Sequence, residues 1–265
     1  VITAFEDDSF NSEDLPPVQS KTVTDTVFFN EFYGLPGLPL IAYYNYSNGN
    51  GYFFGTNYID LDQDPSTPPE PGSPSCAQGY KVSGPGYHIE KILVRVGYKM
   101  KNSPTGTPLV FSIHKLDGES SYTVNSSGGT QQYTIDAPGT GLGSASIPWD
   151  SIVAGFGEFY STAVLQTPVW VDEDYCVVAD FTDFYLNDDR IGLYASAVNG
   201  ANYYGYEYTL WHYPNPYLWL QVTHVYSSMN RAIAIFPVID DGTASLEEAA
   251  PVNGLKMSQN YPNPC

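Results

Sequence analysis

The chain has 265 residues and a formal net charge of −19, with only ten Lys plus Arg. Nucleic acids and anionic membranes are bound through clustered cations, so this balance argues against both partners. No apolar run in the sequence approaches the roughly 18 residues that a membrane span needs. The 23 Tyr, 24 Gly and 21 Pro favour strands and turns over helices. A chain of this length can bury a core without disulfides.

The first part of the chain mixes acidic residues with prolines and then turns to short strand patterns. Residues 1–20 include Pro16 and Pro17 among several carboxylates, which predicts an extended acidic arm. Strands are then expected at about 22–29, 40–46 and 51–54. Residues 60–75 are rich in Pro and Asp, and we expect a loop there.

The clearest period-two pattern lies in the middle of the chain. Apolar residues occupy every second position and are Ile92, Val94, Val96, Tyr98 and Met100. The opposite face holds Leu93, Arg95, Lys99 and Lys101. This alternation predicts a strand with one buried face. Further strands are expected at 109–113, 175–181, 218–224 and 231–239, and a loop is expected at 139–143.

These elements together predict the fold class. Short strands, Gly, Pro and Asn turns about every ten residues, and the lack of an amphipathic helix are typical of an all-β protein. We expect a β-sandwich of jelly-roll type with an N-terminal arm and a C-terminal tail. The expected organisation is an extended acidic arm at 1–20, the sandwich domain at 21–241 and a tail at 242–265 that loses strand character.

Aromatic rings are concentrated between residues 203 and 219. The residues concerned are Tyr203, Tyr204, Tyr206, Tyr208, Trp211, Tyr213, Tyr217 and Trp219. At strand spacing, alternate residues such as Tyr204, Tyr206 and Tyr208 share one face. A row of this kind can pack across strands within the domain, fill a subunit interface, or stack on sugar rings. All three alternatives stay open at this point.

An acidic stretch is the one candidate metal site. Asp60, Asp62 and Asp64 alternate like the carboxylates that begin many calcium loops. Pro65 and Pro71 stand where an EF-hand loop needs Gly and a bidentate Glu, so this is not an EF-hand. A looser calcium site completed by backbone carbonyls is one interpretation, and a solvated acidic loop is the other. No other cofactor is expected.

The three cysteines have different sequence surroundings. Cys76 and Cys265 lie in Pro-rich segments that look irregular, and in an exported protein they would form a disulfide that tethers these segments. An intermolecular disulfide through Cys265 is the alternative. Cys176 lies within the apolar run 175–178, and we expect it to be a buried small hydrophobe.

No catalytic arrangement stands out among the acidic and histidine side chains. The sequence has no Gly-x-Ser-x-Gly elbow, no His-Glu-x-x-His motif and no phosphate loop. Its four histidines are scattered, and 29 acids offer many carboxylate pairs without distinguishing one. The sequence therefore indicates a protein that is not an enzyme.

The end of the chain carries a family resemblance. Residues 259–264 read Gln-Asn-Tyr-Pro-Asn-Pro, which resembles the start of the type A sorting domain of type IX secretion cargo in Bacteroidota-like bacteria. Cys265 stands where that family usually has Phe. The resemblance implies an extracellular location or the outer surface of a Gram-negative cell, with 242–265 as a linker into a truncated sorting signal. The body also resembles unassigned jelly-roll modules common in such cargo.

Four short motifs match glycosylation sites. Thr26 and Ser151 stand in Asp-Ser/Thr-aliphatic tripeptides that resemble O-glycosylation sites of Bacteroidota. Asn45 and Asn125 stand in N-glycan sequons. Glycosylation would fit a surface protein.

From these features we expect an exported, non-enzymatic surface protein that is structural or adhesive. It would form a homo-oligomer or a polymer, such as a filament, through its aromatic-rich strands and one ordered terminus. The first alternative is a carbohydrate-binding module that binds an extracellular glycan through residues 203–219. A jelly-roll glycan hydrolase or lyase is the third, and it needs two carboxylates that converge in an aromatic-lined groove.

Overall fold

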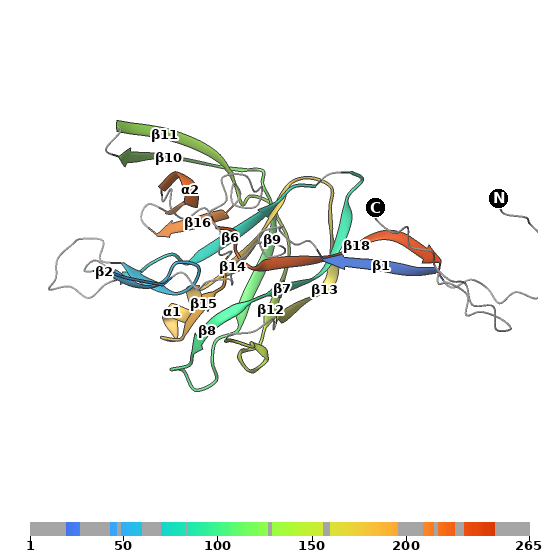
Figure 1. Ribbon diagram of the computed structural model, residues 1–265, viewed down its shortest axis with the longest axis horizontal. Coiled ribbons are helices and arrows are strands. Elements are labelled where there is room, and N and C mark those ends of the chain that lie inside the picture. The colour runs from blue at the N-terminus through green and yellow to red at the C-terminus, as the bar shows by residue number, and fades with distance from the viewer. Residues whose placement is uncertain are drawn as a thin grey trace, which may run out of the picture. The chain divides into compact units, whose positions relative to one another are not determined.

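A computed structural model shows that the described part of the protein consists mostly of β-strands, with few helices (Figure 1). The structure describes residues 20–26, 43–46, 49–59, 70–82, 84–126, 129–155, 160–195, 209–214, 217–225 and 231–246. The chain divides into two units, of which residues 24–241 form one and the two terminal segments form the other. The buried apolar core lies within residues 24–241.

The largest sheet has six strands. In spatial order they are β12 (Gly141–Ile147), β9 (Leu109–Lys115), β14 (Tyr175–Asp180), β6 (Ser75–Tyr80), β16 (Thr209–Pro214) and β17 (Tyr217–Gln221). Each neighbouring pair is antiparallel. β12 and β17 therefore form the two edges of this sheet.

A second sheet has four strands, and its part within residues 24–241 packs against the six-stranded sheet. Its strands, in spatial order, are β1 (Ser20–Thr26), β18 (Ile235–Leu246), β7 (Tyr87–Val94) and β13 (Ser161–Val171). Alternate residues of both sheets enter one continuous buried cluster, for example Phe111 and Ile113 of β9 together with Ile92 and Val94 of β7. The interior is thus filled by side chains at period-two spacing from two facing sheets, which makes the fold a β-sandwich.

Smaller elements surround the sandwich. A second four-stranded sheet contains β2 (Tyr43–Tyr46), β3 (Gly49–Tyr52), β4 (Asn57–Ile59) and β5 (Glu70–Pro71). Two strand pairs complete the β structure: β8 (Val96–Met100) with β15 (Arg190–Leu193), and the hairpin of β10 (Gly118–Ser126) and β11 (Gly129–Ala137). The helices are short and comprise α1 (Thr182–Leu186), α2 (Val222–Val225) and the 3₁₀ turn η3 (Trp149–Ser151).

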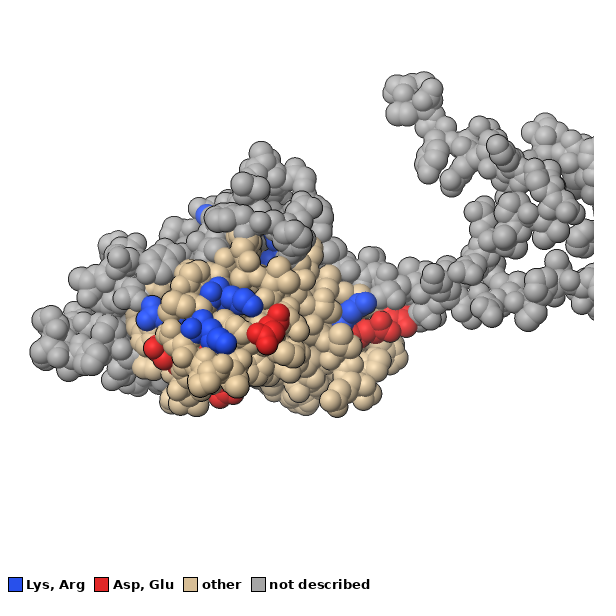
Figure 2. Space-filling model, turned by 90° about the horizontal axis from the view of Figure 1, so that it is seen from below, with Lys and Arg blue, Asp and Glu red and all other residues tan. Residues whose placement is uncertain are grey.

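Charged side chains are sparse on the face of the molecule shown in Figure 2. Lys and Arg side chains lie beside Asp and Glu side chains there, within a wide uncharged surface. This agrees with a charged fraction of 15% in the sequence. Recognition on such a surface has to rely largely on rings, hydroxyls and amides.

The all-β prediction is confirmed, and the two facing sheets confirm the sandwich. Ile92, Val94 and Val96 are buried, as their alternation predicted. The single strand expected there is divided into β7 and β8, which belong to different sheets, and Tyr98 and Met100 are only half-buried. The jelly-roll connection of the strands stays a prediction. The expected arm at 1–20 and tail at 242–265 lie outside the described residues, except where β1 and β18 reach into them.

Several local predictions are wrong. The loop expected at 60–75 contains the short strand β5 at Glu70–Pro71, and β6 begins at Ser75. Residues 139–143 were expected to be a loop, but β12 begins at Gly141 because β9 provides a ladder in which Gly143 pairs with Ile113. The strand expected at 218–224 ends at Gln221, and α2 follows it directly. β18 extends to Leu246, so residues 242–246 belong to a strand.

Candidate functional site

The structure describes part of the predicted aromatic segment. Tyr203, Tyr204, Tyr206 and Tyr208 lie outside the described residues. The other four predicted residues lie on the hairpin of β16 and β17 and are Trp211, Tyr213, Tyr217 and Trp219. Because this hairpin forms one edge of the six-stranded sheet, its side chains divide between the sandwich interior and the outer face.

Trp211 and Tyr213 lie on the inner face. Trp211 is 3% exposed and stacks on Phe53 with ring centroids 5.1 Å apart. Tyr213 lies edge-on to Trp211 at 6.3 Å and packs against the main core cluster. The prediction that Trp211 is available to a subunit or a glycan is therefore wrong, because its indole fills the core.

The outer face of the same hairpin carries three neighbouring rings, His212, Tyr217 and Trp219, which we call the ring patch. The His212 and Trp219 rings stack with centroids 4.8 Å apart, and the Tyr217 ring lies 5.9 Å from His212. Tyr217 is 79% exposed. Burial lowers the pKa of His212, against the opposing effect of the Asp180 charge, so the imidazole is neutral at neutral pH. The patch is thus an uncharged ring surface.

Hydroxyl groups of the β10–β11 hairpin close the outer edge of β17. The Trp219 N–H donates to Ser120 Oγ at 3.1 Å, and Ser120 Oγ donates to the Trp219 carbonyl at 2.7 Å. The Gln221 N–H donates to the Tyr122 hydroxyl at 3.0 Å. These two side chains supply the partners that an additional strand would supply, so strand addition at β17 is blocked.

A group of rings holds the β10–β11 hairpin against α2. Tyr133 stacks on His224 with centroids 3.9 Å apart, and the Tyr122 hydroxyl lies 2.9 Å from His224 Nδ1. Since the Tyr122 hydroxyl accepts from Gln221, its own proton can be donated to Nδ1, which requires a neutral imidazole. Burial lowers the pKa of His224 and so favours this neutral form.

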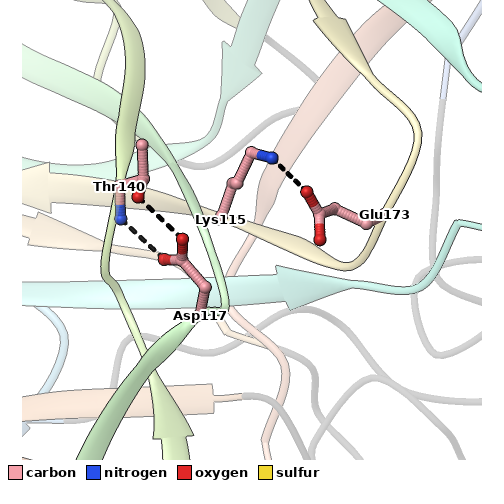
Figure 3. A network of polar contacts seen from close by, with 4 residues as sticks. All are labelled: Lys115, Asp117, Thr140 and Glu173. Atoms are coloured by element: carbon pink, nitrogen blue, oxygen red, sulfur yellow. Dashed lines mark hydrogen bonds and ion pairs between the residues drawn. The ribbon is translucent and has the colours of Figure 1, made fainter.

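The base of the same hairpin is fixed by the polar contacts in Figure 3. Asp117 accepts hydrogen bonds from the Thr140 N–H and hydroxyl, each at 2.7 Å, and Lys115 forms an ion pair with Glu173. The hydrogen bond from the Thr140 hydroxyl lowers the pKa of Asp117. The Asp117–Thr140 bonds join the chain before β10 to the chain before β12, and the ion pair joins the end of β9 to the turn before β14.

The opposite edge of the six-stranded sheet borders an open groove between β12 and β13. The groove has a volume of about 330 Å³ and is lined by Leu142, Gly143, Ser144, Leu165, Gln166, Thr167, Pro168, Val169 and Trp170. Both strands are irregular there. The register of β12 shifts between Gly141 and Gly143, and that of β13 shifts between Val164 and Val169.

These irregularities explain why a groove forms. Residues 165–168 leave the ladder with β7, and Pro168 has no N–H to donate to it. On the facing strand, a Cβ at Gly143 would lie only 2.5 Å from Val169 Cγ2. The two strands therefore touch closely at Gly143 and separate beside it, which leaves a hollow at the sandwich edge.

Trp170 stands at the border of this groove. It is 47% exposed. Its ring meets the ring of His88, its cross-strand neighbour on β7, with centroids 4.9 Å apart and an interplanar angle of 61°. A Cβ at Gly86 would lie 2.8 Å from Trp170 Cζ2, so the indole lies against the backbone there. The indole is thus held by the protein while much of it stays open.

The groove residues were not among the predicted site residues, although the sequence contains a signal for them. In β13, Ala163 and Leu165 are buried, then Val169 and Val171, with exposed residues between them. The alternation is interrupted around Pro168, where the strand bulges. Two short alternating runs flanking a proline can therefore indicate one irregular edge strand.

The predicted calcium ligands Asp60, Asp62 and Asp64 lie outside the described residues. Within the described ranges, no group of three or more His, Cys, Asp or Glu side chains is placed to hold a metal ion. The calcium site stays a prediction.

One buried carboxylate with a shifted pKa, that of Asp189, stabilises the fold. Asp189 accepts hydrogen bonds from the N–H groups of Asn102, Ser103 and Thr107, and from the hydroxyls of Ser103 and Thr107, at 2.7–2.8 Å. Burial by itself would raise the pKa of Asp189, but these bonds outweigh it and lower the pKa to about 2. Asp189 fixes the loop between β8 and β9.

The cysteines differ in part from expectation. Cys176 is fully buried beside Val178 and Leu210, which confirms the prediction of a small core hydrophobe. Cys76 was expected in an irregular segment, but it lies in β6, fully buried and with a free thiol, and burial raises its pKa. The basis for its predicted disulfide with Cys265 is therefore wrong, and Cys265 lies outside the described residues.

Two of the predicted glycosylation residues have described side chains. Ser151 in η3 and Asn125 in β10 are both exposed, and Asn125 Oδ1 accepts a hydrogen bond from Thr130. Thr26 and Asn45 lie in β1 and β2. Modification of these four residues stays a prediction.

No protein-family model, no curated protein and no solved structure matches this chain. Among the residues that the structure describes, no helix is both long and apolar enough to cross a membrane. What can be inferred about function therefore comes from the ring patch and the groove.

Proposed function

We propose that this protein is an exported, non-enzymatic structural or adhesive surface protein that associates with further copies of itself through the ring patch. The observation that carries the proposal is the 79% exposure of Tyr217 beside the stacked rings of His212 and Trp219. Aromatic side chains anchor interfaces because they bury a large area at little cost in rotamer entropy. Rings that are already stacked lose even less freedom on binding.

The closed edge of β17 favours association through the ring face. Ser120 and Tyr122 already bond the outer backbone groups of Trp219 and Gln221. A second copy cannot pair with this edge unless these contacts break, so it docks on the rings. Burial of Trp211 in the core removes one of the two indoles that the carbohydrate alternative for residues 203–219 needed.

The location at the cell surface rests on the tail. Residues 259–264 resemble the start of a type IX sorting domain, and the glycosylation motifs fit an exported protein. Secretion to the outer surface would place the ring patch where copies meet at high local concentration.

Sedimentation velocity tests the association. The wild-type chain is expected to form species heavier than the 29.1 kDa monomer, in a fraction that rises with protein concentration. Tyr217→Ser should shift the distribution to the monomer and change the free energy of unfolding by less than about 0.5 kcal/mol, since the residue is exposed.

Leu186→Ser is the matched control. Leu186 is 78% exposed at the end of α1, outside the ring patch, so its replacement should leave association unchanged. The proposal is contradicted if the wild-type chain stays monomeric at all concentrations, with and without calcium. An equal loss of association in both variants contradicts it as well.

A further inference from the structure

We propose that the groove between β12 and β13 binds a neutral polysaccharide chain, with Trp170 as the stacking surface. The groove and the ring patch belong to opposite edges of the six-stranded sheet. No groove residue comes from the aromatic segment 203–219. The inference is therefore independent of self-association.

The exposed indole provides the apolar part of such a site. The apolar face of a sugar ring stacks on a flat aromatic surface, and this requires an aromatic side chain that is fixed and open. Trp170 meets both conditions, because His88 and the backbone at Gly86 hold it while 47% of it is exposed. Leu142 and Leu165 extend the apolar lining beyond the indole.

Neutral polar side chains provide the hydrogen-bonding groups of the proposed site. Ser144, Gln166 and Thr167 line the groove, and their side chains form no hydrogen bond within the described chain. A hydroxyl and a primary amide each both donate and accept, which matches the donor and acceptor character of sugar hydroxyls. These three side chains are thus available to a ligand.

The charge of the lining selects a neutral ligand. None of the nine lining residues is charged, in a chain whose net charge is −19. An anionic polysaccharide would meet a repulsive field and no cation in the groove, and a cationic one would meet no carboxylate there. An uncharged glycan avoids both penalties.

The same irregularities argue against a peptide strand as the ligand. Strand addition needs a regular row of free N–H and C=O groups along an edge. The β13 edge is interrupted at residues 165–168, with Pro168 among them, and the β12 edge has a bulge at Leu142. Side-chain recognition of a glycan does not depend on this regularity.

Affinity electrophoresis of the full chain tests the inference. The gels contain laminarin, dextran, galactomannan or arabinoxylan as neutral polysaccharides, and alginate as an anionic one. At least one neutral polymer is expected to retard the wild-type chain, and alginate is not. Trp170→Ala should weaken binding at least about tenfold, as truncation of an aromatic anchor does.

Two further variants keep the test decisive. Gln166→Ala alters an exposed side chain without touching the indole and should weaken binding about threefold or more. Tyr217→Ser, in the ring patch, should leave binding unchanged. Thermal unfolding of each variant confirms that it is folded.

The inference is overturned if no neutral polysaccharide retards the wild-type chain. It is also overturned if Trp170→Ala and Gln166→Ala both bind as the wild type does. A synthetic peptide of residues 161–171 serves as a strand probe. If this peptide binds and the polysaccharides do not, the groove is a site for strand addition.

Discussion

The two edges of the six-stranded sheet differ in regularity and in how they are protected. β17 pairs with β16 over five consecutive residues without a register shift, and Ser120 and Tyr122 close its outer side. β12 carries a bulge beside the irregular stretch of β13, and a groove lies open there. A regular edge invites pairing with another strand and has to be covered, whereas a bulged edge can stay open. Recognition at β17 is therefore expected on its ring face, and recognition at β12 in its groove.

Removing the Ser120 and Tyr122 hydroxyl contacts at β17 should lower the stability of the protein more than any other change proposed at the two edges. In the double variant Ser120→Ala and Tyr122→Phe, the N–H groups of Trp219 and Gln221 lose their partners while the rings keep their packing. A fully buried donor without a partner costs about 1–3 kcal/mol. Trp219 and Gln221 are half-buried, so we expect the free energy of unfolding in urea to fall by about 2–4 kcal/mol for the pair, below the sum for two fully buried donors. Light scattering should also detect new association through the uncovered edge.

Ser121→Ala is the control for this pair. Ser121 lies on the exposed face of the same hairpin, where its hydroxyl bonds only to Thr134, and its loss should change stability by less than about 0.5 kcal/mol. If the double variant were as stable as the wild type, water would be replacing the two hydroxyls. The closed edge would then be no better protected than the open one.

The parts of the fold that depend on local spacing could be predicted from the sequence. Leu109, Phe111 and Ile113 occupy every second position of β9, and all three are buried in the core. The contacts that close β17 and open the groove join distant segments. Ser120 and Trp219 are 99 positions apart, and nothing in either segment indicates the other. Long-range register decides these features, and the local pattern of neither segment reveals it.

The aromatic segment shows a second limit of sequence reasoning. Where consecutive residues such as Trp211, His212 and Tyr213 all carry rings, alternation cannot distinguish the buried face from the exposed one. Pairing of β16 with β6 turns Trp211 inward, opposite Cys76, and leaves His212 outside. The sequence therefore locates the aromatic segment as a whole, but only the pairing of the strands shows which of its rings lie in the core and which lie on the surface.

Adding a methyl group at Gly143 tests the open edge and should have an intermediate effect. The new Cβ would lie 2.5 Å from Cγ2 of Val169, which is buried and stiff at χ1 because it is β-branched. Gly143→Ala should therefore lower the free energy of unfolding by about 1–3 kcal/mol through overpacking. It should also weaken binding of the neutral polysaccharides, since the strands that border the groove are forced apart.

Gly141→Ala is the matched control at the same edge. A Cβ there would meet only the His114 ring, at 3.7 Å, which is an ordinary contact. Its stability should stay within about 0.5 kcal/mol of the wild type. Equal losses in the two variants would show that β12 needs glycine for its backbone conformation and not for contact with Val169.

Acidification should weaken the contacts that close the edge of β17. This is the smallest of the expected effects. Burial lowers the pKa of His224 below its ordinary value of 6.5. At a pH between the lowered pKa of His224 in the folded chain and its ordinary value in the unfolded chain, the unfolded chain binds more protons than the folded one. The free energy of unfolding therefore falls as the pH falls through this interval. The contribution of His224 is thus complete above pH 6.5 and is lost as the pH drops through the lowered pKa. His212 in the ring patch shifts in the same direction and adds to the effect.

Protonation of His224 removes the acceptor at Nδ1, and the Tyr122 hydroxyl that bonds Gln221 loses its second partner. Hydrogen exchange should therefore show lower protection of the Trp219 and Gln221 amides at about pH 5.5 than at about pH 7.5, and no change for Val177 in the sheet centre. His224→Phe keeps the stack on Tyr133 but cannot titrate, so protection in this variant should not depend on pH. Unchanged protection in the wild type would mean that the Tyr122 hydroxyl holds the Gln221 amide whether or not His224 is neutral.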